Sequence, residues 1–183
     1  MNRENALVLL KGYIQKEHLI KHMLSVEACM KAVARHFNEN ADEWGLAGLL
    51  HDIDYELTAD TPEKHGQVGA GILEQNQIPK KAIQAIQSHS HLSGLSRDTL
   101  MAKALFAIDP LSGLLIASAL MTPTKKLDAI STPFVLKRFK EKRFAAGANR
   151  EQIKTCEEWG LPLDQLIEIS IGAMQEISES LGL

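Results

Sequence analysis

Apolar residues recur at intervals of three and four positions along most of the chain, which is the spacing of side chains on one face of an α-helix. The clearest series is Leu19, Met23, Val26, Met30, Val33 and Phe37. No segment shows the convincing alternation of apolar and polar residues that marks a half-buried strand. The sequence therefore predicts an all-α fold, in which each helix buries one apolar face against a shared core.

The chain length limits the number of such cores. With 183 residues the chain can form one substantial core, whereas a second full domain would stretch the usual domain size. We therefore expect one domain with a helical extension.

Capping residues and prolines predict where several helices begin. Asp42 is expected to cap a helix that runs into His51, and Thr61-Pro62 is expected to open a helix that carries His65. A further helix should cover residues 79–89. Each of these segments delivers a histidine at or near a helix end.

A later helix should start near Ser96 or Asp98 and carry Asp109. We expect Pro110 to kink this helix, because proline has no backbone N–H to donate. Residues 149–152, Asn-Arg-Glu-Gln, have the form of a capping box, in which the side chains at the two ends bond each other's backbone.

Charge and composition exclude some classes of protein. The 20 basic and 23 acidic residues give a net charge of −3, so no overall basic field favours nucleic acid. Residues 124–143 carry seven Lys or Arg against two Asp or Glu. This basic segment has two interpretations, a solvated helix face or a surface that meets phosphate, and the sequence leaves both open.

The expected location is the cytoplasm. Cys29 and Cys156 lie far apart and have no metal-binding spacing, so we expect two reduced thiols. The N-terminus lacks the pattern of a signal peptide, and the longest apolar stretch, residues 111–121, is shorter than the roughly 20 residues that span a membrane.

His51 and Asp52 follow the apolar residues Gly-Leu-Leu directly. An ionised carboxylate in such a buried setting is costly unless a cation accompanies it. His22, His89 and Asp109 supply further metal-ligand types. A single histidine on a helix is more often a packing residue than a ligand, but the adjacent pair favours a metal site. Mixed imidazole and carboxylate ligands suit Mn, Fe, Co, Ni or Zn.

The order of these residues resembles the H…HD…D signature of the HD superfamily of metal-dependent phosphohydrolases, and most closely its small HDIG-like predicted hydrolases. His22, His51-Asp52 within Leu-Ala-Gly-Leu-Leu-His-Asp-Ile-Asp, and Asp109 within Ala-Ile-Asp-Pro-Leu-Ser-Gly carry the resemblance. It implies an HD-domain helical bundle over residues 1–130. Residues 131–183 would form a C-terminal helical extension packed on the same domain.

The resemblance implies that His22, His51, Asp52 and Asp109 ligate one metal ion. His65 and His89 match the positions that hold a second ion in two-metal members, where Asp52 would bridge. Several of those members have consecutive histidines, whereas this chain has His-Ser-His at residues 89–91. A second ion is therefore left open.

Other residues are candidates for acid-base chemistry and substrate binding. Asp52, Asp54 and Glu56 are the candidate catalytic carboxylates, although Asp54 and Glu56 would equally suit a solvated loop or a position that supports the ligands. Lys21 is a candidate phosphate ligand. In the basic segment and just beyond it, charge for a phosphorylated substrate is offered by Lys137, Lys140, Lys142, Arg143 and Arg150.

Three functions follow from the resemblance. The leading one is hydrolysis of a small phosphoester or nucleotide, in which a hydroxide on the metal attacks phosphorus. The alternatives are an HD-type di-iron oxygenase and a non-catalytic nucleotide-binding module. The expected partner is a small phosphorylated substrate or nucleotide, without a membrane or nucleic acid, and a homo-oligomer is left open.

Overall fold

The computed structural model describes all residues, Met1–Leu183, and contains ten α-helices, three short 3-10 helices and no strand. The predicted all-α fold is confirmed. The α-helices are α1 (Arg3–Tyr13), α2 (Glu17–His36), α3 (Ala41–Leu50), α4 (Gln67–Gln75), α5 (Lys80–His89), α6 (Leu100–Leu120), α7 (Thr132–Phe139), α8 (Arg150–Lys154), α9 (Leu163–Gln175) and α10 (Ser178–Leu181). The 3-10 helices are η1 (Pro62–Lys64), η2 (Leu127–Ala129) and η3 (Thr155–Trp159).

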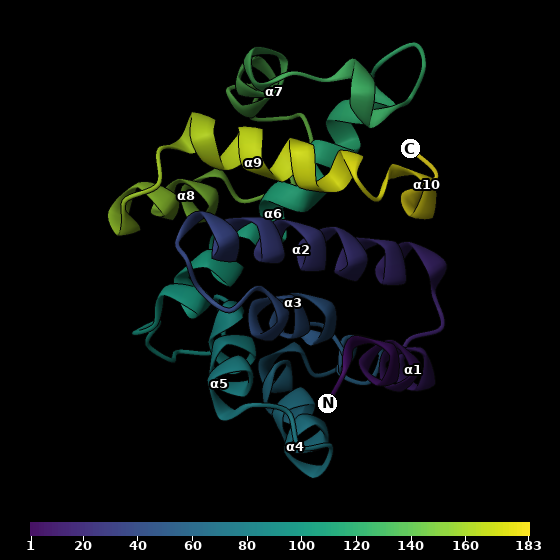
Figure 1. Ribbon diagram of the computed structural model, residues 1–183, viewed down its shortest axis with the longest axis vertical. Helices are drawn as coiled ribbons and strands as arrows, with labels where there is room; N and C mark the ends of the chain where they lie inside the picture. The colour runs from purple at the N-terminus through teal and green to yellow at the C-terminus, as the bar shows by residue number, and fades with distance from the viewer.

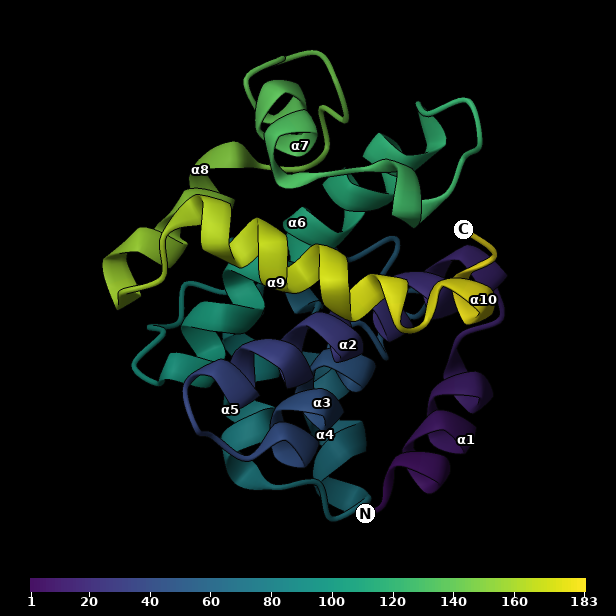
Figure 2. The same ribbon diagram turned by 45° about the horizontal axis from the view of Figure 1, so that its top comes forward.

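Helix α2 lies across the middle of the molecule and packs against α3, α6 and α9 (Figure 1). After a turn of the molecule, α9 and α3 still flank α2 (Figure 2). One cluster of 45 buried apolar residues runs through residues 1–130 and on into α7, α8 and α9. The extension thus shares the main core, and the boundary near residue 130 stays a prediction.

Helices α2 and α3 approach closely because α3 carries glycine at their contact. A Cβ atom on Gly48 would lie 2.9 Å from the backbone N and Cα of Glu27. The absence of a side chain therefore lets the two backbones meet. This contact brings the end of α3, where His51 follows Leu50, beside the face of α2 that carries His22.

Two predicted helix starts are wrong. Asn40, rather than Asp42, caps α3, because its side-chain oxygen accepts hydrogen bonds from the N–H groups of Asp42 and Glu43. Thr61-Pro62 opens only the short helix η1, and α4 starts at Gln67. The helical conformation is interrupted at Gly66, whose φ of 82° lies in the left-handed region that glycine tolerates. His65 therefore lies in a turn.

Helix α6 continues through Pro110 to Leu120, and the kink expected at this proline stays a prediction. Pro110 cannot donate to the carbonyl oxygen of Phe106, four residues earlier. The side-chain amide of Gln152 donates to that oxygen instead, at 2.7 Å. Gln152 is mostly buried, so this bond replaces the missing helical one and ties α8 to α6 beside Asp109.

The hydrogen bond from Gln152 to Phe106 also shows that the predicted capping box is only half formed. The Asn149 side chain does cap α8, because it accepts from the N–H groups of Glu151 and Gln152. The Gln152 side chain, however, points to Phe106 and does not return to Asn149.

Helix α6 is also long and apolar enough, by length and composition alone, to cross a membrane. A central helix of a helical core meets the same test, and most residues of α6 are buried among the other helices. Both cysteines are free and buried, as expected for two separate thiols.

We predict that Gln152→Leu destabilises the protein by about 1–3 kcal/mol, because the Phe106 carbonyl loses its donor in a buried place. In a Pro110→Ala background the new backbone N–H can bond that carbonyl, so the same substitution should cost much less. Urea unfolding of the wild type, Gln152→Leu, Pro110→Ala and the double variant measures the cost of Gln152→Leu in each background. An equal cost in the two backgrounds would contradict this account of α6.

Candidate metal centre

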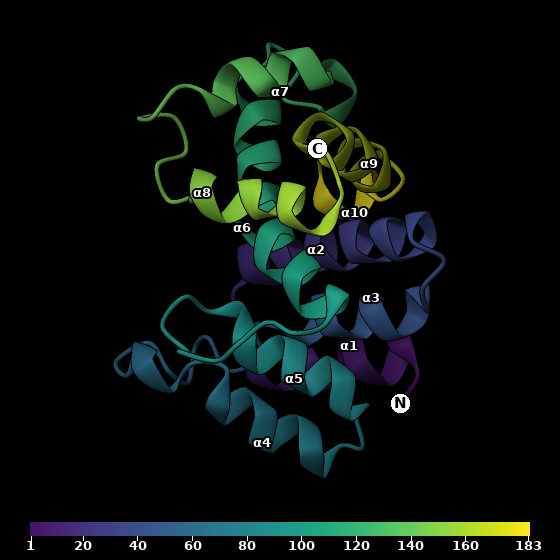
Figure 3. The same ribbon diagram turned by 90° about the vertical axis from the view of Figure 1, so that its left-hand side faces the viewer.

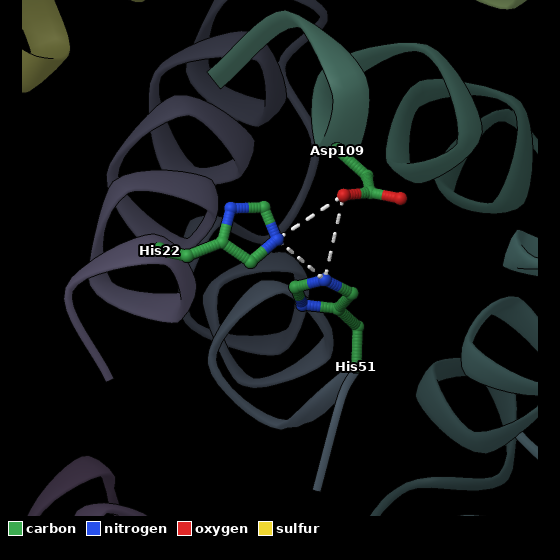
Figure 4. A group of neighbouring side chains, drawn as sticks. All are labelled: His22, His51 and Asp109. Atoms are coloured by element: carbon green, nitrogen blue, oxygen red, sulfur yellow. Dashed lines mark hydrogen bonds and ion pairs between the residues drawn. The ribbon is translucent and has the colours of Figure 1, made fainter. Parts of the chain in front are cut away.

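Three side chains from different helices converge at the centre of the fold. His22 comes from α2, His51 follows α3, and Asp109 lies in the middle of α6 (Figure 4). The Nε2 atoms of the two histidines are 3.2 Å apart, and Oδ1 of Asp109 is 3.1 Å from His22 Nε2 and 3.7 Å from His51 Nε2. Segments far apart in the chain thus meet at one point.

Asp52 adds a fourth donor to this group. Its Oδ2 atom lies 3.4 Å from His51 Nε2 and 3.8 Å from His22 Nε2. Ligands bonded to one ion at about 2.1 Å are themselves about 3.0–3.5 Å apart in octahedral or tetrahedral geometry. The spacing of these donor atoms, and their mixture of imidazole and carboxylate, therefore fits one divalent transition-metal ion.

A second group of donors surrounds the other oxygen of Asp52. Oδ1 lies 3.2 Å from His65 Nε2 and 3.3 Å from His89 Nε2, and the two nitrogens are 3.1 Å apart. This nearly equilateral triangle also has the spacing of ligands on one ion. These three residues would therefore suit a second ion, and Asp52 would belong to both groups of donors.

Three of the four histidines form a hydrogen bond through their Nδ1 atom. Nδ1 of His51 bonds the carbonyl of Gly48 at 2.9 Å, and Nδ1 of His89 bonds the carbonyl of Ile86 at 2.6 Å. The Ser112 hydroxyl accepts from His22 Nδ1 at 3.1 Å and donates to the Asp109 carbonyl at 2.9 Å. With the proton on Nδ1, each Nε2 presents its lone pair to the centre, as metal binding requires.

His65 instead has the carboxylate of Asp54 beside its Nδ1 atom. Asp54 is fully buried, and its Oδ1 lies 2.8 Å from His65 Nδ1. Its Oδ2 accepts from the N–H groups of Gly66 and Gly69, at 2.8 and 2.6 Å. Asp54 therefore orients His65 from behind, and it does not line the cavity described below. This position favours the supporting role over the acid-base role.

The electrostatics of the cluster favour positive charge at its centre. Burial opposes protonation of His51, but Asp52 and Asp109 outweigh it and raise the His51 pKa to about 9. Burial also opposes ionisation of Asp52 and Asp109, yet the neighbouring histidines lower the pKa of both carboxyl groups well below the usual range. The cluster thus stabilises cationic charge between its donors, a need that a divalent ion meets.

The donors form part of the lining of an open cavity of about 930 Å³. His22, Asp52, His65, His89 and Asp109 line it, while His51 is fully buried behind them. The other walls come from the turn after α3, the loop after α5, and the segment between α7 and α8. Figure 3 shows these three segments on one side of the molecule. A small substrate can therefore reach the donors from solvent.

Glu56 and Lys21 lie away from this cavity. The Glu56 carboxylate accepts from the backbone N–H of Gln15, so it joins the turn after α3 to the segment between α1 and α2. The Lys21 ammonium pairs with Glu17 at 3.0 Å on the surface of α2. Neither position favours the expected role, acid-base catalysis for Glu56 or phosphate binding for Lys21.

The basic segment divides into two parts. Lys137, Lys140 and Arg143 are exposed and do not line the cavity, which favours a solvated face for them. Lys142 and Arg150 do line it. Most donors of the Arg150 guanidinium are already used by carbonyl oxygens of its own segment, so this side chain mainly shapes the cavity wall.

Sequence reasoning did not single out several residues that the structure brings to the cavity. Tyr55, His91 and Asn149 line it, although only a capping role was expected for Asn149 and no site role for Tyr55 or His91. Gln152 also lines it, and here a signal existed. A proline inside an amphipathic helix leaves a carbonyl that needs another donor, although the sequence does not say which residue supplies it.

A family model described as HD domain matches residues 19–114, slightly more than half of the chain. The matched range contains all six donor residues of the two groups. No curated protein and no solved structure gives a significant match to the chain.

We predict that the protein, purified without chelator, holds two transition-metal ions per chain. His65→Ala and His89→Ala should each retain one ion, because each removes a donor of the second group only. Asp52→Ala should lose both ions while circular dichroism still shows a helical protein. Elemental mass spectrometry measures the metal, with Asp128→Ala, an exposed site far along the chain, as the matched control. Full metal content in Asp52→Ala would disprove the site.

Proposed function

This chain belongs to the HD-domain family, and we propose that it is a metal-dependent hydrolase of a small phosphoester or nucleotide. The observation that carries the proposal is the pair of donor groups that share Asp52 at the wall of an open cavity. Mn, Fe, Co, Ni or Zn would suit the donors. Two such ions would be held by His22, His51, Asp52, Asp109, His65 and His89.

Bound divalent ions lower the pKa of coordinated water and neutralise phosphate oxygens, which are the main needs of phosphoester hydrolysis. The protein's own contribution is to fix the donors. Ser112, Asp54 and two helix carbonyls fix the imidazole rings through Nδ1, so the Nε2 atoms need not reorganise when a substrate arrives.

The cavity also favours a phosphorylated substrate of moderate size. Its volume of about 930 Å³ is large enough for a nucleotide or a phosphorylated metabolite. The acidic side chains that line it are Asp52 and Asp109, both assigned to the metal ions. Lys142 and Arg150 add positive charge to the remaining wall, so the surface beyond the metal centre attracts anions.

A screen of phosphomonoesters, phosphodiesters and nucleotides with the metal-loaded protein tests the reaction. We expect hydrolysis of at least one class and a loss of at least about a thousandfold in Asp52→Ala, because Asp52 belongs to both donor groups. Asp128→Ala should keep the wild-type rate. A fully metal-loaded protein that hydrolyses no member of the panel would rule out the proposed reaction.

Asp54→Asn provides a finer test of the supporting role. The neutral amide removes the charge that faces His65 Nδ1 at 2.8 Å, so we expect metal affinity and activity to fall about 10–100-fold. Added metal should restore most of the activity, because no group that touches substrate has changed. A loss of activity that excess metal does not restore would instead favour a direct acid-base role for Asp54.

The second group of donors also keeps an HD-type di-iron oxygenase as a second candidate, because that chemistry requires two adjacent ions. Oxygen consumption by the iron-loaded protein in the presence of a candidate substrate would favour it. Hydrolysis with a redox-inert ion such as Zn would favour the phosphohydrolase.

A further inference from the structure

The segment between α7 and α8, residues 140–149, forms part of the cavity wall, and one arginine binds it at several points. The Arg150 guanidinium donates to the carbonyl oxygens of Phe139, Phe144, Ala145 and Ala148, at 3.3 Å for Phe139 and 2.7 Å for Ala145. Four carbonyl groups thus face one cation. The segment is therefore ordered before any ligand binds, which lowers the entropic cost of binding.

This arrangement leaves the backbone donors of the segment free. The N–H groups of Ala146 and Gly147 donate to no acceptor in the protein, and both residues line the cavity and are exposed. The N–H of Ala146 shares a peptide group with the carbonyl of Ala145, which bonds the guanidinium, so this peptide group is polarised and its N–H becomes a stronger donor. Successive free N–H groups of this kind suit an anionic ligand.

Lys142 adds a full charge at the same place. Its side chain is exposed, lines the cavity and forms no ion pair, because the adjacent Glu141 is paired with Arg138 at 2.8 Å. No acidic side chain other than Asp52 and Asp109 lines the cavity. The positive charge on this wall is therefore not neutralised within the protein.

A single phosphoryl group on the metal centre would occupy only a small part of the cavity and would leave this wall unused. No hydrogen bond or ion pair joins residues 140–149 to any of the six donor residues. The segment is therefore a part of the cavity wall distinct from the donor residues.

We propose that Lys142 and the N–H groups of Ala146 and Gly147 bind a second anionic group of the substrate. The substrate class is then a phosphoester that carries a carboxylate or a second phosphoryl group at its far end. This inference rests on the proposed function, because the first phosphoryl group is assigned to the metal centre.

Non-hydrolysable ligands test the inference by calorimetry on the zinc-loaded protein. Alkylphosphonates carry one anionic group, whereas phosphonocarboxylates and bisphosphonates of matched chain length carry two. We expect at least one two-anion ligand to bind about tenfold more tightly than its alkylphosphonate partner, the gain of one good charge contact. Comparison of the two series shows whether the far group is a carboxylate or a phosphoryl.

Lys142→Met should abolish this gain without changing the affinity for alkylphosphonates. Lys103→Met, at an exposed lysine of α6 outside the cavity, is the matched control and should keep the gain. In the wild type, the backbone amide resonances of Ala146 and Gly147 should shift with the two-anion ligand and not with the alkylphosphonate.

The outcomes separate the two proposals. Binding of alkylphosphonates with no gain at any chain length, or a gain that persists in Lys142→Met, would overturn the inference and leave the hydrolase proposal intact. A gain that Lys142→Met abolishes, in a protein that hydrolyses no phosphoester, would remove the proposed reaction and keep the second anion site. No binding of any phosphonate would defeat both.

Discussion

The Asp52 carboxylate is the constraint around which the structure is organised. Its two oxygens face two different groups of imidazole nitrogens, and its side chain is almost completely buried. A buried carboxylate among four histidines is stable only when cationic charge is present and each ring is held in one orientation. Helices α2, α3, α5 and α6 meet here to satisfy both conditions.

The C-terminal extension belongs to the same arrangement. Pro110 follows the donor Asp109 and removes one backbone hydrogen bond from α6, and Gln152 of α8 supplies the replacement. Arg150, two residues earlier, donates hydrogen bonds to carbonyl groups of the preceding segment, which forms a wall of the cavity. The candidate metal centre and the wall beyond it are thus connected through α6 and α8, so the extension contributes to both the fold and the cavity.

Much of this protein could be predicted from local patterns. The helical period predicted an all-α fold, and the order of His22, His51-Asp52 and Asp109 indicated the family that the family model confirmed. Local patterns failed where more than one hydrogen-bond partner was available to the same part of the backbone. Asn40 competes successfully with Asp42 for the cap of α3, and Gly66 interrupts the helix expected after Pro62 because its N–H bonds the distant Asp54.

The sequence by itself determined the helices and the types of donor residue, because helical periodicity and ligand chemistry depend on the residues present and on their order. Only the tertiary structure decided which atoms meet. It placed Asp52 between two groups of donors, moved Glu56 and Lys21 away from the cavity, and brought Lys142 to its wall. Which residues reach the cavity depends on the distances between segments far apart in the chain. The packing of the whole core fixes these distances.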